Sequence, residues 1–413
     1  MRSLLTRFFR ALLKLFFRRI EIAGEEKVPL DRPVIFAANH PNGLLDPLFI
    51  LCFVPRRVSF LAKAPLFRYP VIGALVRMFE SIPVYRKQDN TKGSTAETFG
   101  RAREVLRGGG SIAIFPEGTT HSDSQLRELK TGAARIALGA ELPALTIIPA
   151  GIYYTAKQTF RSEALVWFGE GIEVKPVAIG EDGEPAADDV LSLTSKIEKQ
   201  LDSVTLQADS HAALELIERA ERIFSAGESQ PLASELELRR RFVQGYHYLR
   251  EHDPDRLERL ASLLRRFESE LGGARLDPED LTPRIRAGAM LRIILLLPLA
   301  FVGAIVHFIP YRIVDFLSRR FSKDADEMTA TIKFISALAF YPLTWIAVAA
   351  GSGGLPGVLI AILVAVSGYV ALRVIEDVDD VIGNLRAFRH RDLVAQRQLI
   401  RDQIASVAGA LNL

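Results

Sequence analysis

An uncharged segment near the C-terminal end limits what this chain of 413 residues can fold into. Residues 334–372 contain no Asp, Glu, Lys or Arg. As a single helix they would be about twice as long as the ~30 Å core of a bilayer. The glycine-rich stretch 351–357 interrupts them, so we expect a membrane hairpin with helices near 334–350 and 357–372. The alternative is a pair of buried helices in a soluble core.

A second uncharged stretch, residues 293–311, contains Pro298 and lies between Arg292 and Arg312. Basic residues at both ends disfavour a simple membrane crossing, because positive charges gather on one side of a membrane. Within a membrane region spanning 284–375, we therefore expect 293–311 to be re-entrant or to lie at the surface, in preference to a third span.

The first twenty residues carry six Lys or Arg and no acid. Their basic residues recur on one helical stripe and their apolar residues on another, which is typical of a helix lying in a membrane interface. A secretory signal would instead place its charges before an uninterrupted apolar stretch. We expect an amphipathic membrane-associating helix over 1–22; an ordinary helix docked on the following domain is the alternative.

Charge and cysteine content exclude several kinds of site. The net charge is only +3, so attraction to anions must come from local clusters, and we expect no nucleic-acid partner. The single cysteine, Cys52, excludes an internal disulfide and a cysteine-based metal site, and we expect it in the core. No cluster of ligating residues indicates a metal, and we expect no cofactor.

Strand and helix patterns alternate between residues 32 and 175. Short strands between such helices indicate an α/β domain, a mixed sheet with packed helices, over 23–180. An α-helical lobe (181–283), the membrane helices and a helical tail (376–413) are expected to follow. The expected strands are 33–38, 58–62, 111–115, 146–154 and 165–168, and the expected helices are 46–53, 71–79, 93–107 and 130–140.

Four short patterns with chemical potential follow one another within this domain. They are Asn39-His40 with Asp46, then Ile82–Arg86, then Phe115–Thr119 followed by Leu129–Gly132, and lastly Ile147–Gly151.

His40 stands where a buried strand meets a turn, at the edge where α/β sheets bind ligands. A neutral imidazole there can take a proton from a hydroxyl nucleophile if a carboxylate orients its other nitrogen. Asp46 is in reach only if the turn folds back, which Asn42 and Gly43 allow because both tolerate positive φ. The plainer interpretation is a structural histidine, with Asp46 as N-cap and Pro47 at the first position of a helix.

Arg86 and Lys130 supply fixed positive charge, and Glu117 ends a strand beside a flexible turn. A base with its carboxylate and two cations suits a nucleophile that carries a phosphate. Taken singly, Arg86 is equally an ordinary surface charge and Glu117 part of an ordinary turn. The order of the four patterns favours the chemical interpretation.

Together these patterns resemble those of the PlsC-like glycerophospholipid acyltransferase superfamily, over roughly residues 30–175. Two departures stand out: five residues, not four, separate His40 from Asp46, and Thr120 stands where many lysophosphatidate acyltransferases have Arg. Both resemble the branch of glycerol-3-phosphate and dihydroxyacetone-phosphate acyltransferases. In that branch the Phe-Pro-Glu-Gly block continues into a Ser-His or similar pair, here His121-Ser122, and a long membrane region follows.

The resemblance implies a membrane-bound O-acyltransferase. It would move a fatty acyl chain from acyl-CoA or an acyl carrier protein to glycerol-3-phosphate or dihydroxyacetone phosphate. His40 would be the general base, and Asp46 would orient it. The residues implied in acceptor binding are Arg86, Glu117, Gly118, Thr119, Lys130 and Asn42. Membrane lipids would be partners, and we expect an integral protein with its site at the cytoplasmic face, in a bacterial inner membrane rather than the endoplasmic reticulum.

Three alternatives remain open at this point. The acceptor could be 1-acylglycerol-3-phosphate or another lysophospholipid. The protein could be an inactive membrane scaffold on the same fold, although His40 and Asp46 are both present. A hydrolase is the weakest alternative, because no serine or cysteine nucleophile motif supports it.

Overall fold

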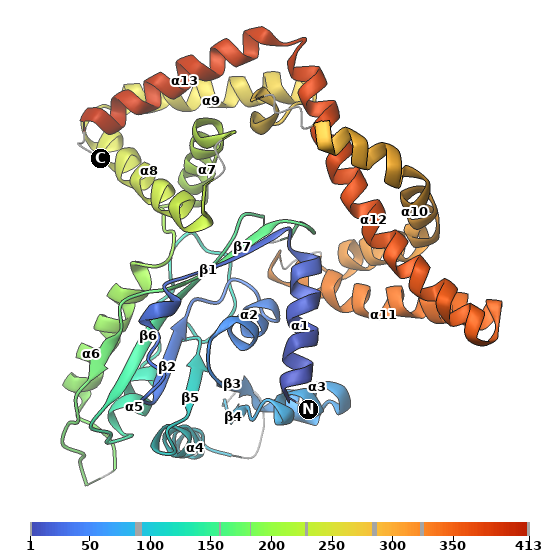
Figure 1. Ribbon diagram of the computed structural model, residues 1–413. Helices are drawn as coiled ribbons and strands as arrows, with labels where there is room; N and C mark the ends of the chain where they lie inside the picture. Colours follow the sequence, from blue (N-terminus) through green and yellow to red (C-terminus); the bar gives the residue numbers. More distant parts are fainter. Residues whose placement is uncertain are drawn as a thin grey trace. The chain divides into compact units, whose positions relative to one another are not determined.

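The computed structural model describes residues 2–86, 93–156, 158–181, 183–227, 230–282, 287–322 and 326–410. It divides into two compact units, which we describe separately (Figure 1). Unit 1 comprises Met1–Gln207 with Asp326–Thr331, and unit 2 comprises Ala208–Ala325 with Ile332–Leu413. The expected boundary between the helical lobe and the membrane region, at 283/284, lies outside the described residues.

Unit 1 contains the expected α/β domain. In chain order its elements are α1 (Arg2–Phe16), β1 (Arg19–Ala23), η1 (Glu25–Lys27), β2 (Val34–Ala38), α2 (Leu45–Phe53), β3 (Ser59–Lys63), η2 (Ala64–Arg68), α3 (Pro70–Met78), β4 (Ile82–Val84), α4 (Thr95–Arg107), β5 (Ser111–Ile114), α5 (Gly132–Leu138), β6 (Leu145–Tyr154), β7 (Glu163–Phe168), β8 (Ile172–Val174) and α6 (Ala187–Asp202). The expected strands and helices of this domain are all present, with ends shifted by no more than two residues. The mixed sheet with packed helices is confirmed.

The sheet has the strand order β1-β7-β6-β2-β5-β3-β4, and β8 also pairs with β6. Strands β6, β2, β5, β3 and β4 run parallel, whereas β7 and β8 are antiparallel to β6. The carboxyl ends of β2, β5, β3 and β4 therefore meet at one edge of the sheet, where open sheets bind ligands.

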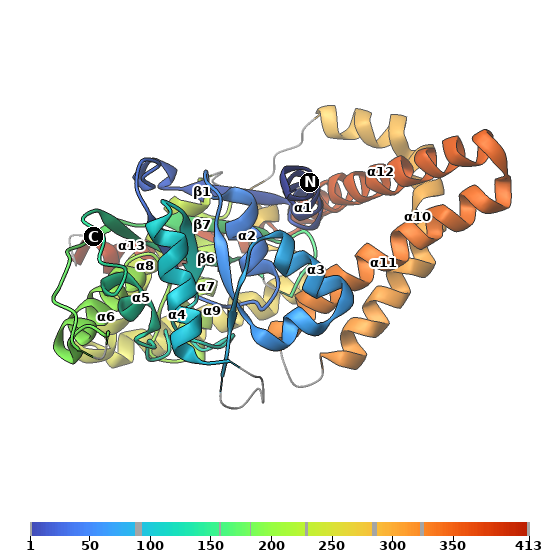
Figure 2. The ribbon, with the colours of Figure 1, turned by 90° about the horizontal axis from the view of Figure 1, so that it is seen from below.

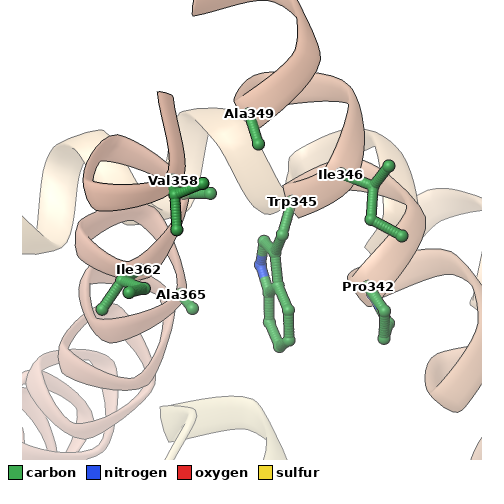
Figure 3. Close-up of a pocket in the computed structure, with 8 residues that line it drawn as sticks. Pro342, Trp345, Ile346, Ala349, Val358, Ile362 and Ala365 are labelled. Carbon is green, nitrogen blue, oxygen red and sulfur yellow. The ribbon is translucent and has the colours of Figure 1, made fainter. Parts of the chain in front are cut away.

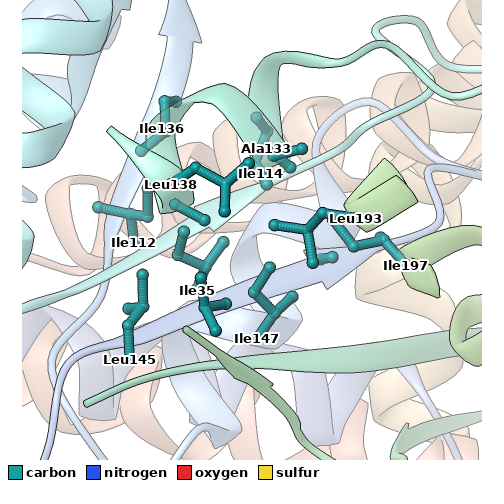
Figure 4. Packing of buried hydrophobic residues seen from close by; sticks show 14 of the residues in the cluster. Ile35, Ile112, Ile114, Ala133, Ile136, Leu138, Leu145, Ile147, Leu193 and Ile197 are labelled. Atoms are coloured by element: carbon teal, nitrogen blue, oxygen red, sulfur yellow. The ribbon is translucent and has the colours of Figure 1, made fainter. Parts of the chain in front are cut away.

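Alternate residues of β2 face two different layers. Ile35 and Ala37 join a core formed with α4, α5 and α6 (Figure 4). Phe36 faces the other way and packs against Phe168 of β7. Helix α6 lies in the range expected for the helical lobe, but its residues Val190, Leu193, Ile197 and Leu201 belong to this sheet core.

The helix expected over residues 1–22 is shorter than expected. Helix α1 ends at Phe16, and Arg19–Ala23 form a strand, β1, because pairing with β7 satisfies their backbone groups. One face of α1 is docked on the domain, through Phe9, Leu13 and Phe16. Another face stays exposed and combines apolar with basic residues: Leu4, Arg7, Phe8, Lys14 and Leu15.

Unit 2 is helical throughout its described residues. Its elements are α7 (His211–Ser225), α8 (Leu232–His252), α9 (Pro254–Ala274), η4 (Pro278–Leu281), α10 (Ala287–Phe321), most of α11 (Asp326–Ser352), α12 (Gly354–Ala387) and α13 (Arg391–Ala410). Helices α7, α9 and α13 share an apolar core with the end of α12.

Three helices, α10, α11 and α12, are long and apolar enough to cross a membrane. Only 17%, 6% and 22% of their most apolar windows are buried inside the protein, so most of that surface requires lipid. The chain is therefore a membrane protein. The expected hairpin corresponds to α11 and α12, which are separated at Gly353, where φ is 69°.

The stretch 293–311, expected to be re-entrant or to lie at the surface, falls within helix α10, and its placement in the membrane stays a prediction. Helix α10 continues unbroken through Pro298 and Pro310 over 35 residues. One of its flanking charges is neutralised, because Arg292 forms a 2.7 Å ion pair with Asp377 of α12. This pair weakens the charge argument against a crossing.

Helices α10 and α12 pack closely (Figure 2). A Cβ atom at Gly303 would lie 2.1 Å from the carbonyl oxygen of Ser367, so only glycine permits this approach. His307 of α10 accepts a hydrogen bond from the Trp345 indole of α11 at 2.9 Å. Trp345 also lines an apolar pocket between α11 and α12, with Pro342 and Val358 (Figure 3).

Candidate active site

The His40 ring is fixed by stacking at the carboxyl edge of the sheet. His40 follows β2, and Phe115 follows the adjacent strand β5. Their ring centroids are 3.9 Å apart with an interplanar angle of 11°. Phe60 of β3 stacks on the far side of Phe115 at 6.4 Å. Three neighbouring strands thus define the plane of the imidazole.

The turn after His40 folds back and brings Asp46 to the ring. His40 Nδ1 lies 2.9 Å from Asp46 Oδ2, although five residues separate the two positions. The same carboxylate oxygen accepts a 2.6 Å hydrogen bond from the backbone N–H of Asn42. The hydrogen bond from Asn42 closes the turn. The contact between His40 and Asp46 assigns the proton to Nδ1, because the carboxylate can only accept.

Asp46 is completely buried, and a tyrosine satisfies its other oxygen. The Tyr154 hydroxyl, at the end of β6, donates to Asp46 Oδ1 at 2.6 Å. Burial raises the pKa of Asp46, and the hydrogen bonds from His40, Tyr154 and Asn42 oppose that rise. Burial and the adjacent carboxylate raise the pKa of Tyr154 well above its usual value, which keeps it a donor.

Asn42 holds the turn that leads into helix α2, whose N-cap position is Leu44 and not Asp46. The Asn42 side-chain oxygen accepts hydrogen bonds from the backbone N–H groups of Leu44 and Leu45, at 3.2 and 3.0 Å. Asp46 lies inside the first turn of α2, which frees its carboxylate for His40. Asn42 is buried and its oxygen also accepts from Thr331, so its described contacts are structural.

The other imidazole nitrogen of His40 is available for chemistry. Among the described residues, Nε2 has no hydrogen-bond partner, and the His40 side chain is 13% exposed. A histidine held in this tautomer by a buried carboxylate presents a basic nitrogen toward the open edge of the sheet.

Glu117 is buried and connects the His40 loop with the loop after β5. Its Oε1 accepts the His40 backbone N–H at 3.0 Å, and its Oε2 accepts the Arg127 backbone N–H at 3.2 Å. His121 Nε2 also hydrogen-bonds Oε2, while His121 Nδ1 accepts the Asp123 N–H at 3.2 Å. Glu117 therefore shapes the site through the backbone.

Two cations flank Gly118, which has a φ of 73°. Arg86, which follows β4, donates to the Gly118 carbonyl at 2.8 Å. The Lys130 side chain passes Gly118, with Cγ 3.4 Å from where a Cβ would lie. Neither cation has a carboxylate partner among the described residues. Thr119, beside them, is exposed. An anion placed here would meet two positive charges.

Tyr154 and His121 are site residues that the sequence analysis did not assign. Tyr154 ends a strand whose residues are nearly all buried, so its sequence context resembles the core around it. His121 follows the Phe-Pro-Glu-Gly block by three residues, and that position was the available signal. The described residues contain no group of three or more His, Cys, Asp or Glu side chains placed to hold a metal ion.

The family model "Acyltransferase" matches residues 19–153. Glycerol-3-phosphate O-acyltransferase 1 of Saccharomyces cerevisiae is 28% identical over 333 residues, covering 58% of this chain and 44% of the relative. Glycerol-3-phosphate O-acyltransferase 2 of the same yeast is 34% identical over 177 residues, covering 41% and 22%. The chloroplastic 1-acyl-sn-glycerol-3-phosphate acyltransferase of Arabidopsis thaliana is 30% identical over 138 residues, covering 33% and 37%.

The chain spans half or less of the length of the curated relatives named above. Among solved structures, the 1-acyl-sn-glycerophosphate acyltransferase PlsC of Thermotoga maritima is 21% identical, with a TM-score of 0.36, covering 48% of this chain and 78% of that one. From the four ordered motifs, the site they form and the family match, we conclude that residues 19–153 form an acyltransferase domain of the PlsC-like kind.

Proposed function

We propose that the protein is a membrane-bound O-acyltransferase that acylates glycerol-3-phosphate or dihydroxyacetone phosphate. The observation that carries this proposal is the buried relay from Tyr154 through Asp46 to His40, whose Nε2 stays unpartnered among the described residues. The two cations at Gly118 support a phosphate-bearing acceptor.

In the proposed reaction, His40 Nε2 takes the proton from the acceptor hydroxyl as its oxygen attacks the thioester carbonyl. Asp46 keeps its negative charge and stabilises the imidazolium through Nδ1–H. When the tetrahedral intermediate collapses, the carbon–sulfur bond breaks, and the imidazolium returns its proton to the departing thiolate. The products are an ester and a free thiol. Arg86 and Lys130 would bind the acceptor phosphate.

Two yeast relatives are named as glycerol-3-phosphate O-acyltransferases, which supports the choice of acceptor. Other relatives are named as 1-acyl-sn-glycerol-3-phosphate acyltransferases, so a lysophosphatidate acceptor is the alternative. For the donor we propose acyl-CoA or an acyl carrier protein, since both present the acyl chain as a thioester.

We further propose that the active site faces the cytoplasm, in a bacterial inner membrane rather than the endoplasmic reticulum. Thioester donors and glycerol phosphates are cytoplasmic compounds, which supports this orientation. Labelling single cysteines placed near His40 in intact cells and in inverted membrane vesicles tests it. Labelling from outside intact cells would contradict the cytoplasmic site.

The reaction is tested in membranes that contain wild type, His40→Ala, Asp46→Asn or the control His252→Ala, which removes an exposed histidine from α8. Labelled long-chain acyl-CoA is supplied, and glycerol-3-phosphate, dihydroxyacetone phosphate and lysophosphatidate are offered separately. We expect product from one of the first two acceptors, and a loss of about 10²–10⁴-fold in His40→Ala. Full activity in His40→Ala would refute the mechanism.

Product from lysophosphatidate alone would select the alternative acceptor. If no acceptor yields product with either acyl-CoA or acyl carrier protein, the scaffold interpretation replaces the enzyme.

A further inference from the structure

A polar pocket that the catalytic arrangement does not use lies on unit 1, beside β3 and β4. Its volume is ≈ 470 Å³, and its lining includes three arginines, Arg68, Arg77 and Arg101, together with Ser81 and Tyr85. None of the lining residues that the structure describes is acidic.

The charge of this pocket is only partly compensated. Arg101 forms a 2.8 Å ion pair with Glu97 one turn away on α4. Among the described residues, Arg68 and Arg77 have no carboxylate partner. Glu80, the acid closest in sequence to Arg77, is paired with Arg2 at 2.6 Å. Among the described residues, only one of the three guanidinium groups, that of Arg101, therefore has a carboxylate partner. Two uncompensated guanidinium groups beside it suit a ligand with several phosphate oxygens.

A hydrogen bond within the protein holds the part of the pocket wall formed by α3 and η2. Arg77 Nη1 donates to the Phe67 carbonyl at 2.8 Å, which ties the end of α3 to η2. Gly73 permits this arrangement, because a Cβ there would lie 2.5 Å from the Phe67 oxygen and 3.1 Å from Arg77 Nη2.

The sheet sets the separation between this pocket and His40. Helix η2 follows β3 directly, and Tyr85 follows β4, so this part of the lining lies at the same carboxyl edge as His40, whereas Ser81 precedes β4. In the order β2-β5-β3-β4, three strand spacings separate the end of β4 from the end of β2. That separation is about 14 Å.

The acceptor's phosphate is only a few bonds from its reacting hydroxyl, so the acceptor cannot bridge this separation. The carrier of an acyl thioester can, because its pantetheine arm contains two amide-linked segments that reach on the order of 15 Å. We propose that the arginine pocket binds phosphate groups of the carrier that delivers the acyl chain. This inference rests on the proposed function and adds a donor site distinct from the acceptor cations.

The test uses the purified full-length chain in detergent, without acceptor. Equilibrium dialysis measures binding of coenzyme A, dephospho-coenzyme A and 4′-phosphopantetheine, the part that coenzyme A shares with acyl carrier protein. Three variants are compared with wild type. The double variant combines Arg68→Gln with Arg77→Gln, and the second variant is Arg101→Gln. The third, Gly73→Ala, disturbs the pocket without removing charge. Arg266→Gln is the control, since Arg266 is exposed and pairs with Glu270 at 2.9 Å as Arg101 pairs with Glu97.

We expect the double variant to weaken coenzyme A binding by about tenfold or more, and the control to leave it unchanged. In assays the KM for acyl-CoA should rise, whereas kcat and the KM for the acceptor should not change. Arginine-dependent coenzyme A binding without any acylated product would support the pocket and reject the proposed function.

Unchanged binding of coenzyme A in a folded double variant would overturn the proposal, as would wild type that binds neither coenzyme A nor 4′-phosphopantetheine. Vesicles of phosphatidylcholine with and without phosphatidylglycerol distinguish the other source of phosphate. If the double variant loses binding to the anionic vesicles but keeps coenzyme A, the pocket is a lipid headgroup site and not a donor site.

Discussion

Tyr154 helps His40 to keep the buried Asp46 carboxylate charged, because the carboxylate has no access to water. In Tyr154→Phe, Asp46 Oδ1 loses its donor while remaining buried. Leaving a buried charged group unsatisfied costs about 1–3 kcal/mol, so we expect roughly tenfold lower kcat/KM. The hydrogen bond from Tyr154 lowers the pKa of Asp46, and its loss therefore raises the pKa of Asp46.

The acid limb of the pH profile should accordingly move to higher pH in Tyr154→Phe, because Asp46 then binds a proton more tightly. The measurement is kcat/KM against pH for wild type, Tyr154→Phe and Tyr246→Phe, a control on α8. An unshifted acid limb in Tyr154→Phe would exclude Tyr154 from the relay.

We predict that His121 is a positioning residue, which acts through Glu117 without touching the substrate. His121→Ala removes one donor to the buried Glu117 carboxylate, which holds the His40 backbone. We expect kcat to fall by roughly tenfold to a hundredfold with little change in either KM, since only the placement of the base is altered. His121→Gln, which keeps a donor, should recover most of the rate. Equal losses in both variants would contradict this role.

The contacts of His40, Asp46 and Tyr154 show which roles of single residues the sequence could indicate. His40 and Asp46 were predictable as a pair, because a turn that tolerates positive φ can bring them together. Their environment was not predictable: the alternative interpretation of Asp46 as N-cap was wrong, because helix α2 begins one residue earlier, at Leu45, and its N-cap position is Leu44. Tyr154 contacts Asp46 across 108 positions, a separation that local patterns cannot bridge.

Among the elements, α1 is docked on the domain over Cys52, so the reactivity of Cys52 reports on this docking. Burial raises the pKa of the Cys52 thiol to about 12. Cys52 Sγ lies 3.7 Å from the Thr6 carbonyl of α1, so the docked helix covers it. We expect Cys52 to remain unreactive toward thiol reagents at pH 8, because its thiol stays protonated and covered. The same result is expected with anionic vesicles, because α1 would contact the membrane through its exposed face and stay docked on the domain.

The measurement is the rate of Cys52 modification with and without vesicles. Protein unfolded in guanidinium serves as the reference, because its thiol is fully accessible. Faster modification on adding vesicles would mean that α1 leaves the domain to bind the membrane.

Helix α10 depends on Gly303 for its contact with α12. In Gly303→Ala the new methyl group would overlap the Ser367 carbonyl, and backbone atoms cannot move aside without separating the helices. We expect a loss of about 1–3 kcal/mol, measured as a lower unfolding midpoint in detergent. Gly288→Ala, on the same helix with no atom within 4 Å of the added Cβ, should be neutral or stabilising. Equal midpoints for the two variants would show that α10 and α12 do not pack closely.

The elements that the sequence did not indicate are short or depend on distant partners. Strand β4 has three residues, and β1 is a strand only because β7, more than 140 residues away, pairs with it. For helix α10 the sequence did not indicate that Arg292 pairs with Asp377, because Asp377 lies on a helix that begins 62 residues later.

At the scale of the whole molecule, three apolar helices should make membrane attachment resistant to salt and alkali. We expect the chain to stay in the membrane fraction through 1 M salt and alkaline carbonate, because apolar burial does not depend on charge. A variant with Arg7, Lys14 and Arg18 changed to Gln should behave identically in this extraction. Release of wild type by carbonate would show that these helices do not span.

Helix α12 is continuous from its apolar segment into a charged segment that ends in the helical lobe. Its last fifteen residues, from Arg373 to Ala387, rise about 22 Å along the helix axis. Two contacts hold their last turns against the lobe: Asp280 of η4 lies against Gly383, and Arg386 donates to the carbonyl of Arg275 at the end of α9. The helix therefore works as a rigid spacer, and the height of the lobe above the lipid is set by the number of residues in α12.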